Sequence, residues 1–394
     1  MTLLGWLIFI FALLFSIMLH EAGHFATAKA FHMKVTQFFV GFGQTIWSWR
    51  RGETEYGVKA IPAGGFVKIV GMTALDEDVD PADEPRSFRR KPGWQRMIVM
   101  AAGSFMHFTL AFVLLFVMAV GIGLADTNSP TLGTIYPCVP KSEKAAVCTK
   151  SDPASPAAKA GLRSGDTITA LAGHPVHTWS QLATDIRRHP AGSAVALTVR
   201  RNGRTLTVHA RLTSIPGRKG SYLGISEAAV FQPVNPVRGI TAAGSQFGEI
   251  VTGSVGAVGS IPAEIPTLFN RSHASSGQGL TSIVGAGEIT GQAFALKVPW
   301  QLKITVVLDI IVSLNIFVGL FNLFPLLPLD GGHLAVVIYE RARAWLARLR
   351  GKPDPGLVDM RKLIPVSVGV FAIVIGFSLI VIMANLVNPV QLPQ

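Results

Sequence analysis

The pentapeptide His20-Glu21-Ala22-Gly23-His24 ends an uncharged apolar run that extends from Leu3 to Leu19. Two histidines four residues apart lie on one face of a helix, where their imidazole nitrogens can bind a single zinc ion. Glu21 would then face the open side of the metal and could take a proton from a bound water. Because zinc lowers the pKa of that water to about 7, the spacing predicts hydrolysis at neutral pH.

The position of this motif in an apolar run supports a functional role. A charged residue at the centre of a membrane helix costs about 2.5–3.5 kcal/mol, so an ionisable cluster in such a run is a functional candidate. The run also resembles the core of a secretory signal peptide, with Ala28-Lys29-Ala30 as the cleavage site. However, no Lys or Arg precedes it, and its length of about 17 residues exceeds the usual 7–15. Both features argue against a signal peptide.

The composition is that of a membrane protein. The 394 residues are 49% hydrophobic, with a mean hydropathy of +0.43, and only 15% are charged, against about 25% in soluble domains. The net charge of +12 does not indicate nucleic-acid binding, because the basic residues are spread over several loops and no nucleic-acid motif accompanies them. Four segments are long and apolar enough to cross about 30 Å of hydrocarbon. They are approximately Leu3–Phe31, Met97–Ala125, Ile304–Leu329 and Leu363–Leu386.

Basic residues near the ends of the spans predict the orientation. They are concentrated between spans one and two and between spans three and four, so both loops are expected to be cytoplasmic. Residues 126–301 and both termini would then lie outside, since long domains are translocated largely regardless of charge. Cys138 and Cys148 fall in this outer segment, where they could form a disulfide or remain free thiols.

A catalytic zinc site with two histidines needs a third protein ligand. Asp330, in the segment from Asn322 to Gly331, lies at the cytoplasmic end of the third span, at the same depth as the two histidines. Prolines such as Pro325 break the helix and allow Asp330 to turn inward. His107 and His333 are alternative ligands, and Asp330 could also cap the next helix. We favour Asp330 because His333 lies further out and His107 lies farther from the cytoplasmic end.

Other residues near this site could bind a substrate. The β-prone runs Thr45–Trp49 and Tyr56–Ile61 flank an Arg-Gly turn and predict a hairpin on the cytoplasmic side. Gly64 and Gly65 follow and would let another backbone approach closely, so an exposed edge could bind an extended peptide by strand addition. The alternative is a hairpin that only packs on the membrane face. Asn322 could hold the substrate backbone or a developing oxyanion.

Residues 126–230 predict a compact α+β module. A helix ends at Gly161, a second helix covers Trp179–Arg188, and a hairpin turns at Asn202-Gly203. This pattern resembles a PDZ domain, with Tyr222–Ile225 as a candidate carboxylate-binding loop. The chain therefore divides into residues 1–125 with two spans and the hairpin, 126–230 with the PDZ module, 231–301 as an outer amphipathic or linker segment, and 302–394 with two further spans. The outer segment is expected to form helices or re-entrant pieces at the membrane surface.

The combination of motifs resembles the site-2 protease family of intramembrane zinc metalloproteases. The resemblance rests on His20-Glu21-x-x-His24 on the first span and on Asn322-x-x-Pro325-x-x-Pro328-x-Asp330-Gly331 on the third, and it covers nearly the whole chain. A single PDZ module and four spans are similar to the bacterial enzymes that cleave anti-sigma factors. In span two, Ser104 and His107 stand where relatives typically have Pro and Asn. The resemblance implies one Zn²⁺ per chain, Glu21 as the catalytic residue, the metal ligands His20, His24 and Asp330, and the substrate-binding residues Asn322, Gly64, Gly65, Pro325 and Gly331.

The sequence thus predicts an α-helical polytopic protein of the bacterial inner membrane, with a cytoplasmic-side β-hairpin and an inserted extracytoplasmic PDZ domain. Its expected function is the cleavage of single-span membrane proteins near the cytoplasmic side, in regulated intramembrane proteolysis and signalling. Expected partners are transmembrane substrates, a peptide or protein at the PDZ domain, and the lipid bilayer. The alternatives are a metal-ion transporter, which would need neither Glu21 nor a peptide-binding module, and an inactive PDZ scaffold, which would not need an intact set of His, Glu and Asp.

Overall fold

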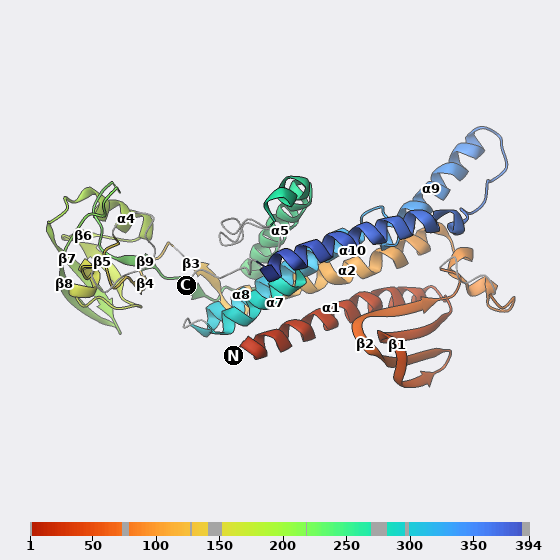
Figure 1. Cartoon of the computed structure of the whole chain (residues 1–394), viewed down its shortest axis with the longest axis horizontal. Coiled ribbons are helices and arrows are strands. Elements are labelled where there is room, and N and C mark those ends of the chain that lie inside the picture. Colours follow the sequence, from red (N-terminus) through yellow and green to blue (C-terminus); the bar gives the residue numbers. More distant parts are fainter. Residues whose placement is uncertain are drawn as a thin grey trace. The chain divides into compact units, whose positions relative to one another are not determined.

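The chain forms two compact units (Figure 1), one made of residues 1–117 and 236–394 and the other of residues 118–235. The computed structural model describes residues 2–72, 79–126, 128–140, 152–217, 219–268, 282–295 and 299–387. The first unit carries the motifs predicted to do chemistry, and the second carries the predicted α+β module.

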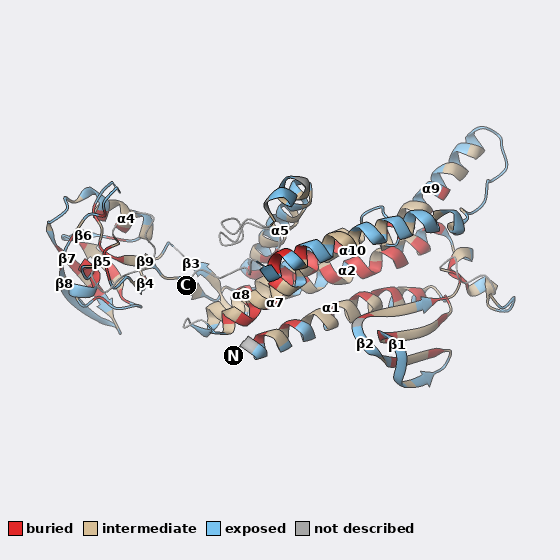
Figure 2. Ribbon diagram, in the orientation of Figure 1, coloured by how far each residue is buried: buried red, intermediate tan, exposed pale blue. Residues whose placement is uncertain are grey.

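Four helices in the described residues are long and apolar enough to cross a membrane, which confirms the predicted number. They are α1 (Thr2–Ala30), α2 (Gly93–Val117, continued by a π-helical turn over Met118–Ile122), α8 (Trp300–Asn322) and α10 (Ile364–Val387). α2 contacts both α1 and α8. α10 is largely exposed (Figure 2), as expected for an apolar helix whose surface is covered by lipid.

The third span ends earlier than the sequence predicted. We expected it to continue to about Leu329, but α8 ends at Asn322, and a separate helix, α9 (Asp330–Leu349), begins after the proline-containing connection. Pro325 and Pro328 explain the break, because proline lacks the backbone N–H that a helix needs and disfavours helical geometry in the residue before it. Asp330 is therefore the first residue of a new helix, and Leu329, not Asp330, occupies the N-cap position.

Two long strands follow α1. β1 (Val35–Arg51) and β2 (Thr54–Ile69) pair antiparallel from Arg51↔Thr54 to Val35↔Ile69, with several register shifts. The hairpin includes the glycine stretch after Ile61, which we had placed beyond the second strand. β2 also contacts α1, so the hairpin lies beside the helix that carries the pentapeptide.

Two helices lie in the segment that was predicted to be amphipathic and to form helices or re-entrant pieces. α5 (Pro236–Glu264) contacts α2 and α8, and α7 (Ile283–Ala295) contacts α1, α8 and α10. α7 and α1 approach closely because both present glycines at their contact: a Cβ on Gly287 would lie 2.3 Å from the Trp6 ring, and a Cβ on Gly5 would lie 2.8 Å from the Cα of Gly291. Small residues allow such close helix crossings.

The second unit is an α+β module with a four-stranded antiparallel sheet in the order β6-β5-β7-β8. Its hydrophobic core includes Leu171, Leu182 and Leu197. Cys138 is disulfide-bonded, while Cys148 lies outside the described residues. The elements are β3 (Leu124–Asp126), β4 (Leu132–Ile135), α3 (Pro156–Lys159), β5 (Thr167–Leu171), β6 (His174–Pro175), α4 (Trp179–Arg188), β7 (Ala194–Arg201), β8 (Arg204–Arg211), β9 (Ile225–Glu227) and β10 (Val230–Gln232).

Candidate metal centre

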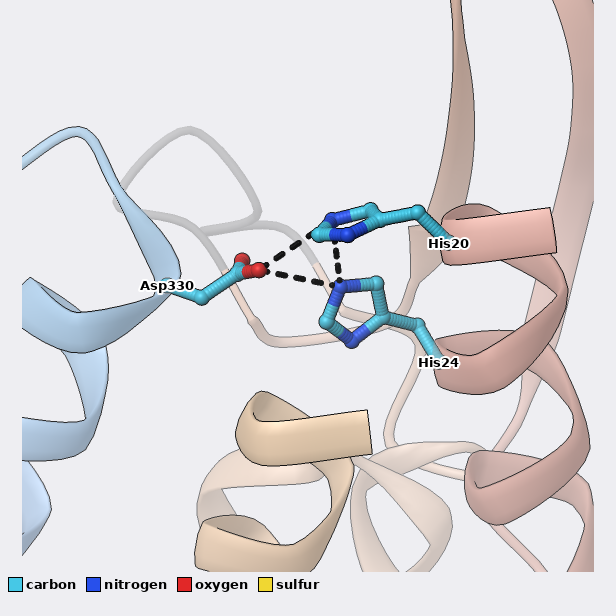
Figure 3. A group of neighbouring side chains, drawn as sticks. All are labelled: His20, His24 and Asp330. Carbon is cyan, nitrogen blue, oxygen red and sulfur yellow. Dashed lines mark hydrogen bonds and ion pairs between the residues drawn. The ribbon is translucent and has the colours of Figure 1, made fainter. Parts of the chain in front are cut away.

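Three side chains from two helices converge in the first unit (Figure 3). His20 and His24 lie one turn apart on α1, and Asp330 approaches them from the first turn of α9. Oδ2 of Asp330 lies 3.2 Å from Nε2 of each histidine, and the two Nε2 atoms are 3.1 Å apart. The structure thus brings the three predicted ligands together.

The separations suit a zinc ion. Ligand atoms about 2.0–2.1 Å from a tetrahedral zinc lie roughly 3.3 Å from one another, close to the 3.1–3.2 Å seen between these three atoms. Nδ1 of His24 lies 2.7 Å from the carbonyl oxygen of Val99, to which it can donate its proton. That hydrogen bond leaves the lone pair of the His24 Nε2 free to bind a metal. A metal-binding histidine usually donates its other ring N–H in this way. Three protein atoms also leave a fourth position for water or substrate.

α2 forms the floor of this centre. A Cβ built on Gly103 would lie 2.4 Å from Cε1 of His20 and 2.5 Å from Nε2 of His24. No side chain fits at this position while the two histidines face Asp330. Gly103 therefore has to be glycine for the imidazoles to converge, although nothing in the sequence distinguishes it from the other glycines.

Glu21 lies on the hairpin side of the same helix. A Cβ on Gly65 of β2 would be 3.3 Å from Cγ of Glu21 and 2.9 Å from the Met18 sulfur, so β2 passes directly over this face of α1. The Glu21 carboxylate is close enough to His20, His24 and Asp330 to interact with their charges. The structure therefore places a carboxylate between the candidate ligands and the strand predicted to bind substrate.

The other predicted substrate-binding residues are more dispersed. Gly64 packs against the Phe42 ring beside Gly65. Asn322 is half-buried at the end of α8, and Pro325 is exposed in the connection to α9. Gly331 is buried: a Cβ there would lie 2.3 Å from the backbone of Leu323 and Phe324. This contact gives Gly331 a packing role in the first α9 turn, and its predicted role in substrate binding stays a prediction.

Neither alternative ligand belongs to the three-residue group found among the described residues. Nδ1 of His107 lies 2.8 Å from Oδ1 of Asn315 and 3.0 Å from Oγ of Ser16. His333 lines a separate cavity of about 240 Å³ together with Arg96 and Glu340. Ser16 and Asn315 were not among the predicted site residues, although a polar residue in an apolar span is itself a signal of function.

Comparison with known proteins places these residues in a family. The model of peptidase family M50 matches residues 8–352. The chain belongs to this family. It is 34% identical to zinc metalloprotease Rip1 of Mycobacterium tuberculosis over 417 residues, covering 100% of both chains, and 34% identical to Rip1 of Mycolicibacterium smegmatis, covering 99% of both. Among solved structures, the PDZ domain of an SdrC-like protein from Listeria monocytogenes matches 24% of this chain and 90% of that domain, at 21% identity and a TM-score of 0.18.

The chain is thus an M50 zinc metalloprotease and a multi-pass membrane protein, as the motifs had indicated. Its cofactor is Zn²⁺. The geometry of the three candidate ligands fits that metal on its own, since two imidazoles and one carboxylate are typical of catalytic zinc sites in peptidases.

Proposed function

We propose that this protein is an intramembrane endopeptidase that cuts the transmembrane segments of single-span membrane proteins. The observation that carries the proposal is the convergence of His20 and His24, inside an apolar helix, with Asp330 after the broken third span. These three residues would hold one zinc ion. Ionisable groups inside membrane spans are costly, so their presence indicates that the reaction takes place at that depth. The substrate would then be a segment that lies within the membrane.

Bound zinc would polarise the scissile carbonyl and lower the pKa of a water molecule. Glu21 would accept the proton of that water at its carboxylate and then donate it to the leaving amine nitrogen. Asn322, at the end of α8, would donate an amide N–H to the substrate backbone or to the developing negative charge.

The β1–β2 hairpin would hold the substrate. A transmembrane helix hides its carbonyls in its own hydrogen bonds, so it must be extended before hydrolysis. β2 supports this step because Gly65, which follows Gly64, lies against the helix carrying Glu21, and a strand added to β2 would run past that carboxylate. Pro325 in the exposed connection would contact the same extended segment.

The second unit would select substrates from outside the cell membrane. Its α+β fold and its disulfide-bonded Cys138 are consistent with a PDZ domain in an oxidising compartment. The active site would then lie near the cytoplasmic side of the bacterial inner membrane. The domain would bind a newly formed C-terminus or exclude bulky ectodomains, after a first cut by another protease. Anti-sigma factors are the proposed substrates, which makes the enzyme part of a signalling pathway.

A Glu21→Gln variant tests the function. We expect it to keep zinc and lose cleavage, so truncated single-span proteins should accumulate in membranes of variant cells and not in wild type. The matched control is Glu249→Gln, which changes an exposed glutamate on α5. If the variant processes membrane proteins as wild type does, the proposed role of Glu21 is wrong; if zinc flux across the membrane is lost instead, the site transports metal.

A further inference from the structure

Three membrane helices meet at a buried group of polar side chains. Ser16 of α1, His107 of α2 and Asn315 of α8 are 5%, 3% and 1% exposed, respectively. Hydrolysis as proposed above uses none of them. Because polar groups inside apolar spans are costly, their presence calls for a functional reason. We refer to these three residues as the polar cluster.

The hydrogen bonds of the polar cluster fix the protonation of His107. Nδ2 of Asn315 donates to the carbonyl oxygen of Ile311 at 2.8 Å, so Oδ1 of Asn315 is the atom that faces Ser16 and His107. An amide oxygen only accepts hydrogen bonds. Nδ1 of His107, 2.8 Å away, must therefore carry a proton and donate it. The hydroxyl of Ser16 donates to the same oxygen. His107 is thus held in one tautomer and one ring orientation.

The His107 ring lies against a candidate metal ligand. Its centroid is 5.0 Å from that of His20, with the two planes tilted by 44°. Ser16 and Gly103 precede His20 and His107, respectively, by one helical turn, and a Cβ on Gly103 would lie 2.7 Å from Nδ1 of His20. The His20 imidazole is therefore confined by the α2 backbone at Gly103 and by the His107 ring one turn along.

The two histidine ligands are oriented in different ways. Nδ1 of His24 is hydrogen-bonded to the carbonyl of Val99 at 2.7 Å, which sets its ring. Nδ1 of His20 is buried and has no hydrogen-bond partner among the described residues. A metal ligand without such a bond must be oriented by packing alone. The His107 ring supplies this packing together with the α2 backbone at Gly103.

We propose that His107 is a positioning residue of the metal centre: Ser16 and Asn315 fix its ring, and the ring fixes His20 so that Nε2 faces His24 and Asp330. The proposal rests on the ligand set assigned under the proposed function. It also gives a reason for the imidazole in span two: a planar ring with one donor nitrogen can satisfy Asn315 and pack on His20 at the same time.

Zinc affinity of the purified full-length protein tests this proposal, measured by competition with a chromophoric chelator. We expect Asn315→Leu to weaken zinc binding about 10–100-fold, because loss of the residues that orient metal ligands typically has an effect of that size. His107→Ala should have a similar effect, and the double variant should be no worse than His107→Ala, because the two residues act through one ring. Absorption spectra of Co²⁺ bound in place of zinc should also change, since they report ligand geometry.

Two further hydroxyl deletions make the test independent of misfolding. Ser16→Ala removes one oxygen and should weaken zinc binding in the same direction by a smaller factor. Ser104→Ala removes an equally buried hydroxyl from α2 that has no partner among the described residues, and should bind zinc as wild type does. Wild-type zinc affinity and Co²⁺ spectra in Ser16→Ala and Asn315→Leu would overturn the proposal.

The ligand set is tested separately with His24→Ala and Asp330→Asn. If both lose zinc while Asn315→Leu and Ser16→Ala keep wild-type affinity, only the positioning role of His107 is wrong. If His24→Ala and Asp330→Asn both keep zinc, the ligand set is wrong, and the role of His107 at this centre is wrong with it.

Discussion

Removing one partner of the ion pair between Arg96 of α2 and Glu340 of α9 should destabilise the membrane unit by several kcal/mol. Nη1 of Arg96 lies 2.8 Å from Oε2 of Glu340, and the two side chains are only 10% and 8% exposed. Glu340 also accepts the backbone N–H of Val358 at 2.8 Å, so it joins α2, α9 and the segment before α10. Arg96→Met would leave the Glu340 charge buried without its partner, and we expect a loss of about 3–5 kcal/mol in the free energy of unfolding.

The matched control is Arg86→Met. Arg86 pairs with Glu53 at 2.7 Å, but the two side chains are 42% and 27% exposed, so the same chemical change should cost less than about 1 kcal/mol. The double variant Arg96→Met/Glu340→Gln removes the uncompensated charge and keeps an acceptor for Val358, and should recover about 2 kcal/mol or more of the loss.

The assay is reversible unfolding of the purified protein in mild detergent by added SDS. Tryptophan fluorescence reports it, because Trp94 and Trp345 lie close in sequence to the two members of the pair. If Arg96→Met costs no more than Arg86→Met, or if the double variant is no more stable than Arg96→Met, the electrostatic reasoning is wrong, and the pair contributes only packing.

Two other outcomes follow from the structure. Gly103→Ala should abolish zinc binding, because its Cβ would lie 2.4 Å from the His20 ring, whereas Gly248→Ala, on α5 with open space around it, should leave zinc affinity unchanged. In the second unit, burial of the Asp166 carboxyl opposes its ionisation, but Arg201 at 2.7 Å outweighs burial and holds the pKa of Asp166 below its usual 3.8. Stability from this pair is therefore complete above about pH 4–5 and is lost as the pH falls through the lowered pKa. Hydrogen exchange in β5 and β7 should show that loss in wild type and not in Arg201→Gln.

Patterns that are local in the chain predicted most of the architecture. The four spans follow from apolar runs, and α4 covers the predicted Trp179–Arg188, because polar and apolar side chains there alternate with helical periodicity. The hairpin of β7 and β8 turns at Asn202 and Gly203, both with positive φ, as that dipeptide favours. The convergence of His20 with Asp330, far apart in sequence, could be predicted because chemistry demanded a third ligand at the same depth.

Features that depend on contacts between distant segments could not be predicted. Gly287 looks like any other glycine until the Trp6 ring is found where its side chain would be. For the same reason nothing in the sequence showed that α5 packs against α2 and α8, or α7 against α1, α8 and α10. Ser16 and Asn315 are polar residues in apolar spans, but nothing in the sequence shows that both would meet His107.

The sequence did not show that α2 orients the candidate zinc ligands. It carries no proposed zinc ligand, yet Val99 orients one histidine, Gly103 admits both, and His107 packs on the other. Three residues before Val99, Arg96 holds α9, the helix that presents the carboxylate. Since the ligands come from α1 and α9, the distance between them depends on the helix that both contact. Substitutions along this face of α2 should therefore reduce zinc affinity more than they reduce substrate affinity, although no residue of α2 is proposed to contact the zinc or the substrate.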